Sequence, residues 1–357
     1  MSRGVSRRSL IVDCLRVLRP RFHNHNSFRF GTDFPIDTIE RKRMNATITP
    51  TLSERMVEYI SRSPATIAVE TSIFLFIGLI AIGGNLLVVI SIYRNPSLRT
   101  ISNYFVLSLA VSDILYPVTA LPLTIVWSVE SSSIPGKRIC VFQAIASFGL
   151  LYVSVTTMVV MAVNRFVCVC KPQKYKIVFS KKKSLVIIGV VWIINFTLMT
   201  INFNEQVLHR ADFEPSKIWC GLVLARKTTL ITIIINVVFV VILVVPFSII
   251  SYCYFKVFDK IREHKKNVAP ASNPNNLGTS VQEIKVTRTM FTVLIGYCAT
   301  WIPVLIIVLV SIHTRVPREG HMMVTYAAAS SSAINPVIYG VMNNAFRQEY
   351  KKIIKCR

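Results

Sequence analysis

The sequence predicts an all-α membrane protein, a seven-transmembrane helix bundle followed by a short amphipathic helix on the cytoplasmic side. Two observations lead to this fold class. Of the 357 residues, 52% are apolar and only 16% are charged, and the apolar residues gather into long uninterrupted runs. Soluble domains carry about 25% charged residues. The composition therefore excludes an ordinary soluble protein, and also a disordered chain, in which polar residues dominate.

Seven runs are long enough to cross a bilayer, which takes roughly 20 residues of helix. Because lipid offers backbone groups no hydrogen-bonding partner, each run is expected to be helical. Six runs contain no charged residue, and the second contains a single acid, Asp113. In chain order they cover residues 71–93, 100–129, 141–164, 184–204, 228–255, 289–314 and 320–346.

Lysine and arginine gather in every second connection between these runs. The basic connections contain Arg94 and Arg99, Lys171 to Lys183, Lys256 to Arg288, and Arg347 to Arg357. Positively charged loops stay on the cytoplasmic side of a membrane. We therefore expect a multi-pass plasma-membrane protein with an extracellular amino terminus. The net charge of +24 then reflects topology, and nucleic acid is not expected as a partner.

Three regions follow from these runs. Residues 1–65 are expected to form a disordered extracellular tail, in which Asn45 begins a glycosylation motif. Residues 1–43 are a possible start-site artefact, because Met44 offers a second start. Residues 66–342 form the helical bundle. Residues 343–357 are predicted to form an amphipathic helix on the inner membrane face, with Cys356 as a palmitoylation site or a structural cysteine.

The cysteines divide by their side of the membrane. Of the eight, Cys140 and Cys220 lie at the outer ends of runs or in outer loops, where disulfides persist. A bridge between them would pin the second outer loop over the bundle. Cys14 is an odd cysteine on the same side.

Asp113 is the clearest functional candidate, because an ionisable group inside a membrane is costly. Asn85 and Asn335, in two other runs, could converge on it to form a cation site. The alternative is a neutral, hydrogen-bonded structural acid. A different class of protein, an ion-coupled transporter with Asp113 as its relay, would be expected to show internal repeats, and none is visible. The sequence holds no phosphate-binding glycine loop, no paired acids and no zinc-type cluster, so we do not expect an enzyme.

The runs share a set of motifs with one family. They are Gly84-Asn85, Leu107 to Asp113, Cys140, Asn164-Arg165-Phe166, Trp192, Pro246, Tyr254, Trp301-Ile302-Pro303 and Asn335-Pro336-Val337-Ile338-Tyr339. Together they resemble the rhodopsin-like (class A) G-protein-coupled receptors. Stretches 84–95, 164–170 and 338–354 look most like the melatonin receptors.

The resemblance implies a ligand pocket in the outer half of the bundle. Its expected lining is Ser147, Phe148, Leu151, Asn202, Val238, Ile242, Trp301, Val304, Leu305 and Thr325. Ser147 stands where amine receptors keep an acid, and Ala329 stands where opsins keep a lysine. Such a largely apolar lining suits a small, neutral or apolar ligand. A peptide ligand is the alternative, because the second outer loop is long and carries mixed charge.

The resemblance also implies a switch at the cytoplasmic end that activates a heterotrimeric G protein, with the inhibitory class favoured. Arg165 is expected to pair with Glu283 in the inactive state. On activation the sixth run would swing outward around Pro303, and Arg165 would turn toward Tyr254 and Tyr339. Asn164 replaces the usual acid beside Arg165, which predicts raised basal activity. The resemblance implies no cofactor, but an allosteric sodium ion is expected at Asp113, Ser154, Ser331 and Asn335.

Overall fold

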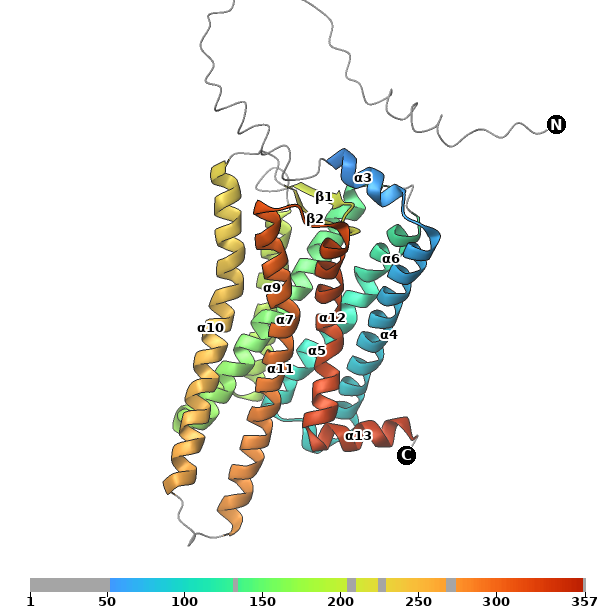
Figure 1. The fold of residues 1–357 in the computed structure, drawn as a ribbon. Helices are drawn as coiled ribbons and strands as arrows, with labels where there is room; N and C mark the ends of the chain where they lie inside the picture. Colours follow the sequence, from blue (N-terminus) through green and yellow to red (C-terminus); the bar gives the residue numbers. More distant parts are fainter. Residues whose placement is uncertain (1–51, 131–133, 204–209, 224–228, 268–273, 356–357) are drawn as a thin grey trace, which may run out of the picture. The chain divides into compact units, whose positions relative to one another are not determined.

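A computed structural model of the chain describes residues 52–130, 134–203, 210–223, 229–267 and 274–355 (Figure 1). The side chains of residues 229–243 and 274–287 lie outside this description, and so do residues 1–51 and 356–357. The predicted roles of Asn45, Cys356, Val238, Ile242 and Glu283 therefore concern side chains that the structure does not describe.

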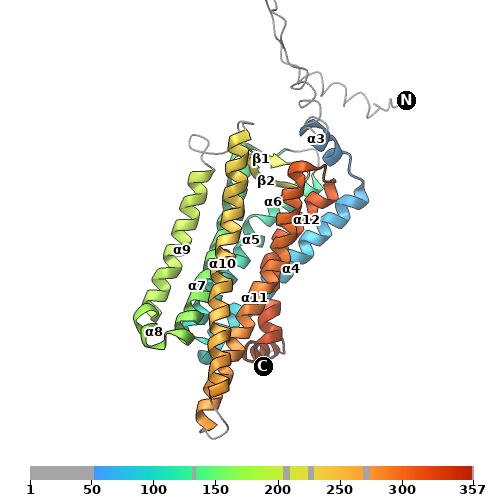
Figure 2. The same ribbon diagram turned by 60° about the vertical axis from the view of Figure 1, so that its left-hand side comes forward.

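Long helices form the bundle and run side by side in both views (Figures 1 and 2). They are α4 (Pro64–Arg94), α5 (Ile101–Thr119) with α6 (Leu121–Val129), α7 (Lys137–Cys170), α9 (Lys181–Asn202), α10 (Thr229–Asn267), α11 (Pro274–His313) and α12 (Arg318–Met342). Short elements join or flank them: α3 (Leu52–Ile60), the 3-10 helix η1 (Pro96–Leu98), α8 (Pro172–Val178), α13 (Asn344–Ile354) and the strands β1 (Arg210–Glu214) and β2 (Trp219–Val223).

Four α-helices within the described residues begin at a side-chain cap. The oxygens of Ser63, Thr100 and Ser180 each accept a hydrogen bond from the backbone N–H three residues later, and Asn343 accepts one from Ala345 N. These caps satisfy amide groups that the first turn of a helix leaves without a partner. Polar residues between the apolar runs thus set where α4, α5, α9 and α13 start.

Five segments of the described residues are long and apolar enough to cross a membrane: Pro64–Arg94, Ile101–Val129, Lys137–Cys170, Lys181–Asn202 and Phe291–Ser311. The remaining two predicted spans fall on α10 and α12. Polar residues, among them three consecutive serines at 330–332, make α12 less apolar than its neighbours. Large apolar side chains such as Phe76 and Ile193 point outward from the bundle, as lipid-facing side chains do.

The second predicted run is not one continuous helix. It divides into α5 and α6 at Ala120, between Pro117 inside α5 and Pro122 in the first turn of α6. Proline has no N–H to donate and its ring clashes with the preceding turn, so a helix bends or breaks there. Together α5 and α6, over Ile101–Val129, are still long and apolar enough to cross a membrane as a single span.

The prediction of a disordered tail over residues 1–65 is wrong for residues 52–60, which form α3. Tyr59 on this helix is 0% exposed, and its hydroxyl donates to the Trp127 carbonyl at 2.6 Å. Its ring also packs edge-on against Phe213 of β1. A buried aromatic side chain with its polar atom satisfied anchors α3 to α6 and the hairpin.

Helix α13 lies across one end of the bundle (Figure 1). We call this the inner end, and the end that carries the β1–β2 hairpin the outer end. Phe346 on α13 is buried against the ring of Tyr339, with centroids 5.6 Å apart. Asn95, at the end of α4, donates to Glu349 at 3.2 Å. The amphipathic helix predicted after the last span is thus present, and it packs on α12 through its apolar face.

Strands β1 and β2 form an antiparallel hairpin in the second outer loop, with Asp212 opposite Gly221 and Phe213 opposite Cys220. No local pattern predicts this hairpin, because the two strands are short and Cys220 is held by a long-range bond.

Candidate functional site

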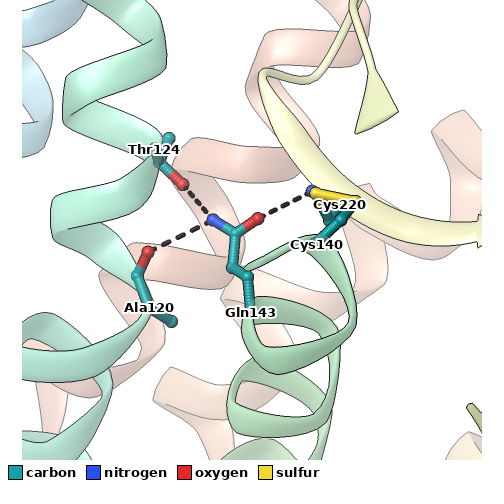
Figure 3. Close-up of a disulfide and its surroundings, with 5 residues drawn as sticks. All are labelled: Ala120, Thr124, Cys140, Gln143 and Cys220. Carbon is teal, nitrogen blue, oxygen red and sulfur yellow. Dashed lines mark hydrogen bonds between the residues drawn. A yellow bond between two sulfur atoms is a disulfide. The ribbon is translucent and has the colours of Figure 1, made fainter. Parts of the chain in front are cut away.

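The predicted disulfide between Cys140 and Cys220 is present and links residues 80 positions apart (Figure 3). It ties β2 to the first turn of α7. Gln143, one turn further along α7, holds the same region through its amide. Its Oε1 accepts a hydrogen bond from Cys220 N at 2.8 Å. Its Nε2 donates to Thr124 Oγ1 at 2.9 Å and to the Ala120 carbonyl at 3.2 Å.

Gln143 therefore joins three features of the outer end: the hairpin, α6 and the break between α5 and α6. It is 1% exposed and uses both ends of its amide. A buried polar group with every partner in place fixes the relative position of the elements that it joins. Sequence reasoning missed this residue, because a single glutamine in an apolar run carries no signal without the fold.

The tip of the hairpin reaches residues predicted to line the ligand pocket. The ring of Phe148 on α7 lies 5.7 Å from the ring centroid of Trp219 on β2 and 5.7 Å from that of Phe203. Thr325 on α12 is buried, and its hydroxyl donates to the Lys217 carbonyl at 2.8 Å. The second outer loop thus supplies part of the predicted ligand region.

Ile218 stands at the centre of this tip. It is 0% exposed, and its φ of 52° lies in the left-handed region that β-branched residues rarely adopt. Such a conformation costs about 1–3 kcal/mol, and full burial of an isoleucine side chain offsets about 1.5–3 kcal/mol. The buried side chain and the Thr325 hydrogen bond together hold the turn in place.

The other predicted pocket residues are brought together only in part. Trp301 and Val304 are buried on α11, and the Trp301 ring stacks on Tyr297 with centroids 5.7 Å apart. Ser147, Leu151 and Leu305 are half-buried. Asn202 donates to the Leu198 carbonyl of its own helix at 2.8 Å, so its amide hydrogen bond stays local.

Asp113 lies in the middle of the bundle and is 3% exposed. Its Oδ2 accepts a hydrogen bond from Asn335 Nδ2 at 2.7 Å. The hydroxyls of Ser154 and Ser332 also interact with this carboxylate. Ser331, which the sequence placed here, instead donates to the Ala328 carbonyl within α12. One residue of helix turns a side chain by about 100°, so Ser332 replaces Ser331 in the predicted set.

Residues around Asp113 extend this polar region between helices. Asn85 Nδ2 donates to the Ala81 and Ser332 carbonyls at 2.8 and 2.9 Å, and Ser112 hydrogen-bonds to Ser154 at 2.9 Å. Oxygen atoms with one negative charge are the ligands that hard cations prefer. The donor set therefore fits a sodium ion, which Asp113, Ser154, Ser332 and Asn335 would hold.

A cavity of about 490 Å³ opens at the inner end. Its lining includes Arg165 of α7, Tyr339 of α12 and Thr289 of α11. It thus touches three of the helices on which the sequence placed the switch. Pro303 lies inside α11, as predicted, and Tyr254 is buried against the ring of Phe291 at 5.8 Å.

Asn164, which replaces an acid beside Arg165, has partners of its own. Its Oδ1 accepts from Ser102 Oγ at 2.8 Å, and its Nδ2 donates to the Tyr175 hydroxyl at 3.4 Å. It thus connects α7 to α5 and α8 through neutral hydrogen bonds. Asn164 thus offers Arg165 no acidic partner. The raised basal activity expected from this stays a prediction.

Three aromatic side chains on α11 and α12 each have a buried polar atom with no hydrogen-bond partner within the described part of the chain. The atoms are the Tyr297 hydroxyl, Trp301 Nε1 and the Tyr339 hydroxyl. Buried polar groups in folded proteins are nearly always paired, with water where not with protein. Two of these atoms lie on α11, the helix expected to swing outward, and the third lies on α12.

A second buried acid, Glu70, lies at the outer end and was not singled out from the sequence. Arg318 binds its carboxylate through two nitrogens at 2.5 and 3.0 Å, and Arg62 binds it at 2.6 Å. Arg62 also donates to the carbonyls of Tyr59 and Ser128. This cluster, which we call the Glu70 triad (Glu70, Arg62 and Arg318), joins the start of α4 to the start of α12.

Comparison with known proteins gives one family and several relatives. Residues 84–339 match the family of 7 transmembrane receptors described as the rhodopsin family. The chain is similar to melatonin receptor type 1A of Ovis aries, with 30% identity over 80% of this chain and 77% of that protein. It is 28% identical to melatonin receptor type 1A of Gallus gallus over 82% of each chain. It is also 26% identical to neuropeptide FF receptor 2 of Mus musculus, over 83% of this chain and 74% of the relative.

Proposed function

Because this chain belongs to the rhodopsin family of seven-transmembrane receptors, we propose that it binds a small, largely apolar extracellular ligand at its outer end and activates an inhibitory G protein at its inner end. It is a G-protein-coupled receptor and a multi-pass plasma-membrane protein. The family and its relatives give no support for an ion-coupled transporter. The extracellular amino terminus, glycosylation at Asn45 and palmitoylation at Cys356 stay proposals.

The observation that carries the coupling proposal is the inner cavity. Its lining joins Arg165 to Tyr339 and Thr289, on three helices that must move apart to admit a partner. A ligand shifts such an equilibrium only if it binds one arrangement more tightly than the other. The hydroxyl of Tyr339 has no hydrogen-bond partner among the described residues, so a second arrangement could supply one.

The ligand proposal is supported by Phe148 and Thr325, which the hairpin tip meets at the outer end. The ring of Trp219 on Phe148 gives this region an aromatic, apolar surface. A small, largely apolar ligand agrees with such a surface. The likeness to a neuropeptide receptor keeps a peptide as the second candidate.

A cyclic-AMP assay in transfected cells tests both ends. Forskolin-raised cyclic AMP should fall on addition of an agonist from a panel of indoleamines, lipids and peptides, and pertussis toxin should cancel the fall. Arg165→Ala should abolish the response at unchanged surface expression. A rise in cyclic AMP, or a response that pertussis toxin leaves intact, would contradict the inhibitory class.

The proposed lock between Arg165 and Glu283 has its own test. Glu283→Ala should raise ligand-free signalling, because it removes the acid expected to hold Arg165 in the inactive state. Glu263→Ala is the matched control, since Glu263 pairs with Lys260 on an exposed face of α10. Equal basal signalling in both variants would show that the lock is wrong.

A further inference from the structure

We propose that Lys217, at the tip of the β1–β2 hairpin, binds a carboxylate on the ligand, so that the ligand is an amphipathic acid rather than a neutral molecule. The inference rests on the ligand site proposed above and adds a charge to it. Neither the sequence pattern of the spans nor the apolar lining of the bundle indicates this charge, because Lys217 comes from a loop.

The position of Lys217 is fixed by its backbone. Its N–H donates to the Glu214 carbonyl at 3.1 Å, which closes the turn between the strands, and its carbonyl accepts from Thr325 at 2.8 Å. The next residue, Ile218, is buried in a left-handed conformation. The lysine therefore cannot leave α12 without breaking the Thr325 bond and moving Ile218.

The nearest acid to Lys217 is already engaged. Both carboxylate oxygens of Glu214 accept a hydrogen bond from Arg55 Nη1, each at 2.8 Å. Within the described ranges, the Lys217 ammonium has no ion pair and no hydrogen bond. Arg55 Nε is buried and also has no acceptor there. Within the described residues, Arg55 and Lys217 thus depend on the single carboxylate of Glu214, and Arg55 holds both of its oxygens.

A partly buried cation without a paired acid is costly. Burial lowers the pKa of Lys217, and the Glu214 carboxylate opposes this only in part. A lysine that served structure alone would be expected to have its own acid, as Arg62 and Arg318 have Glu70. An anion supplied by a ligand would relieve the cost and so would bind tightly at this point.

The surroundings of the ammonium define the rest of the ligand. Lys217 Nζ lies 6.0 Å from the ring centroid of Trp219, and Trp219 packs on Phe148. An acid group on Lys217 would therefore be followed by an aromatic or aliphatic body against these rings. The chemical class is a small carboxylic acid with an apolar body.

Thermal unfolding of the purified full-length receptor tests this with a matched pair of probes, 3-phenylpropionate and 3-phenylpropanamide, which differ only in charge. The acid should raise the unfolding temperature in a concentration-dependent way, because a ligand of the native state stabilises it. Lys217→Gln should weaken the apparent affinity for the acid at least tenfold. Lys217→Arg should retain it, and Lys137→Gln, an exposed outer lysine, should behave as the wild type.

The proposal is overturned if the acid gives no shift, if acid and amide shift the wild type equally, or if Lys217→Gln keeps the full shift. If the acid and the amide raised the unfolding temperature equally, and Phe148→Ala abolished both effects, the outer ligand site would stand and only the role of the Lys217 charge would be rejected. Coupling to the G protein is measured separately by the cyclic-AMP response, so failure of the carboxylate site is distinguishable from failure of the receptor function.

Discussion

Two buried acids, Glu70 at the outer end and Asp113 in the middle of the bundle, are about equally inaccessible, at 6% and 3% exposure. Their neighbours differ in charge. Glu70 lies between the guanidinium groups of Arg62 and Arg318. Within the described residues Asp113 has hydrogen-bond donors but no ion pair, and the neutral amide of Asn335 donates to it at 2.7 Å.

The difference shows how a buried carboxylate can serve either structure or regulation. At Glu70 the charge is matched by side chains whose positions are set by the fold, so the triad acts as a fixed joint between α4, α12 and the segment before α4. At Asp113 the described side chains offer hydrogen bonds but no positive charge. A charge of this second kind can be neutralised by a proton or a mobile cation, which makes it suited to regulation.

The largest expected effect is that of Glu70→Gln. It would leave two buried guanidinium groups without their acid, which typically costs about 3–5 kcal/mol of the free energy of unfolding. Thermal unfolding of purified receptor measures this. Glu263→Gln, which breaks an exposed pair, is the control and should leave the unfolding temperature unchanged. If the two variants were equally stable, the triad would not be a structural joint.

Gly84→Ala comes next and tests packing at the level of Asn85 and Asn335. A Cβ at Gly84 would lie 2.6 Å from Pro336 Cγ and 2.9 Å from its Cβ, and the rigid proline ring cannot move aside easily. Overpacking of this kind costs about 1–3 kcal/mol. Gly83→Ala, whose Cβ would meet nothing within 4 Å, should be neutral. A stable Gly84→Ala would mean that α4 and α12 can separate there.

A smaller loss of about 1 kcal/mol is expected for Tyr59→Phe, because the buried Trp127 carbonyl would lose its donor while the ring contact with Phe213 remains. The same unfolding measurement applies. Tyr59→Ala should cost distinctly more, since it also removes the ring. Equal losses in both variants would indicate that the hydroxyl alone anchors α3.

Asp113→Asn should change the free energy of unfolding least, by less than about 1 kcal/mol, because a neutral amide can keep hydrogen bonds to its neighbours and removes an uncompensated charge. Its effect should appear in regulation. Agonist affinity of the wild type should fall as sodium rises, and this dependence should be lost in the variant. Radioligand competition in sodium and in N-methylglucamine measures it. A sodium dependence that survived would place the ion elsewhere.

The sequence indicates one of these two buried acids and not the other. Asp113 was found because one acid interrupts an apolar run, and the Cys140–Cys220 bond followed from the side of the membrane. Glu70 gives no such signal, because it directly precedes the run at 71–93 and does not interrupt it. Its partner Arg318 lies 248 residues away, and no local pattern links such a pair.

Other differences arise where one residue of register or one loop decides the geometry. Ser332 rather than Ser331 faces Asp113, because helix phase is not determined by composition in a segment with three consecutive serines. The hairpin and the position of Lys217 depend on the disulfide and on Thr325, so they emerge only from tertiary structure. The spans and α13 were predictable because length and apolar periodicity alone specify them.

The break at Ala120 has a consequence for how such a receptor can diverge. Below it, α5 carries Asp113; above it, α6 is bound through Gln143 to the disulfide-linked hairpin. The second span is thus two mechanical parts in one stretch of chain. In related receptors α6 can shift when the loop length or the ligand changes, while α5 keeps its register. Ligand recognition can therefore diverge without altering the environment of Asp113.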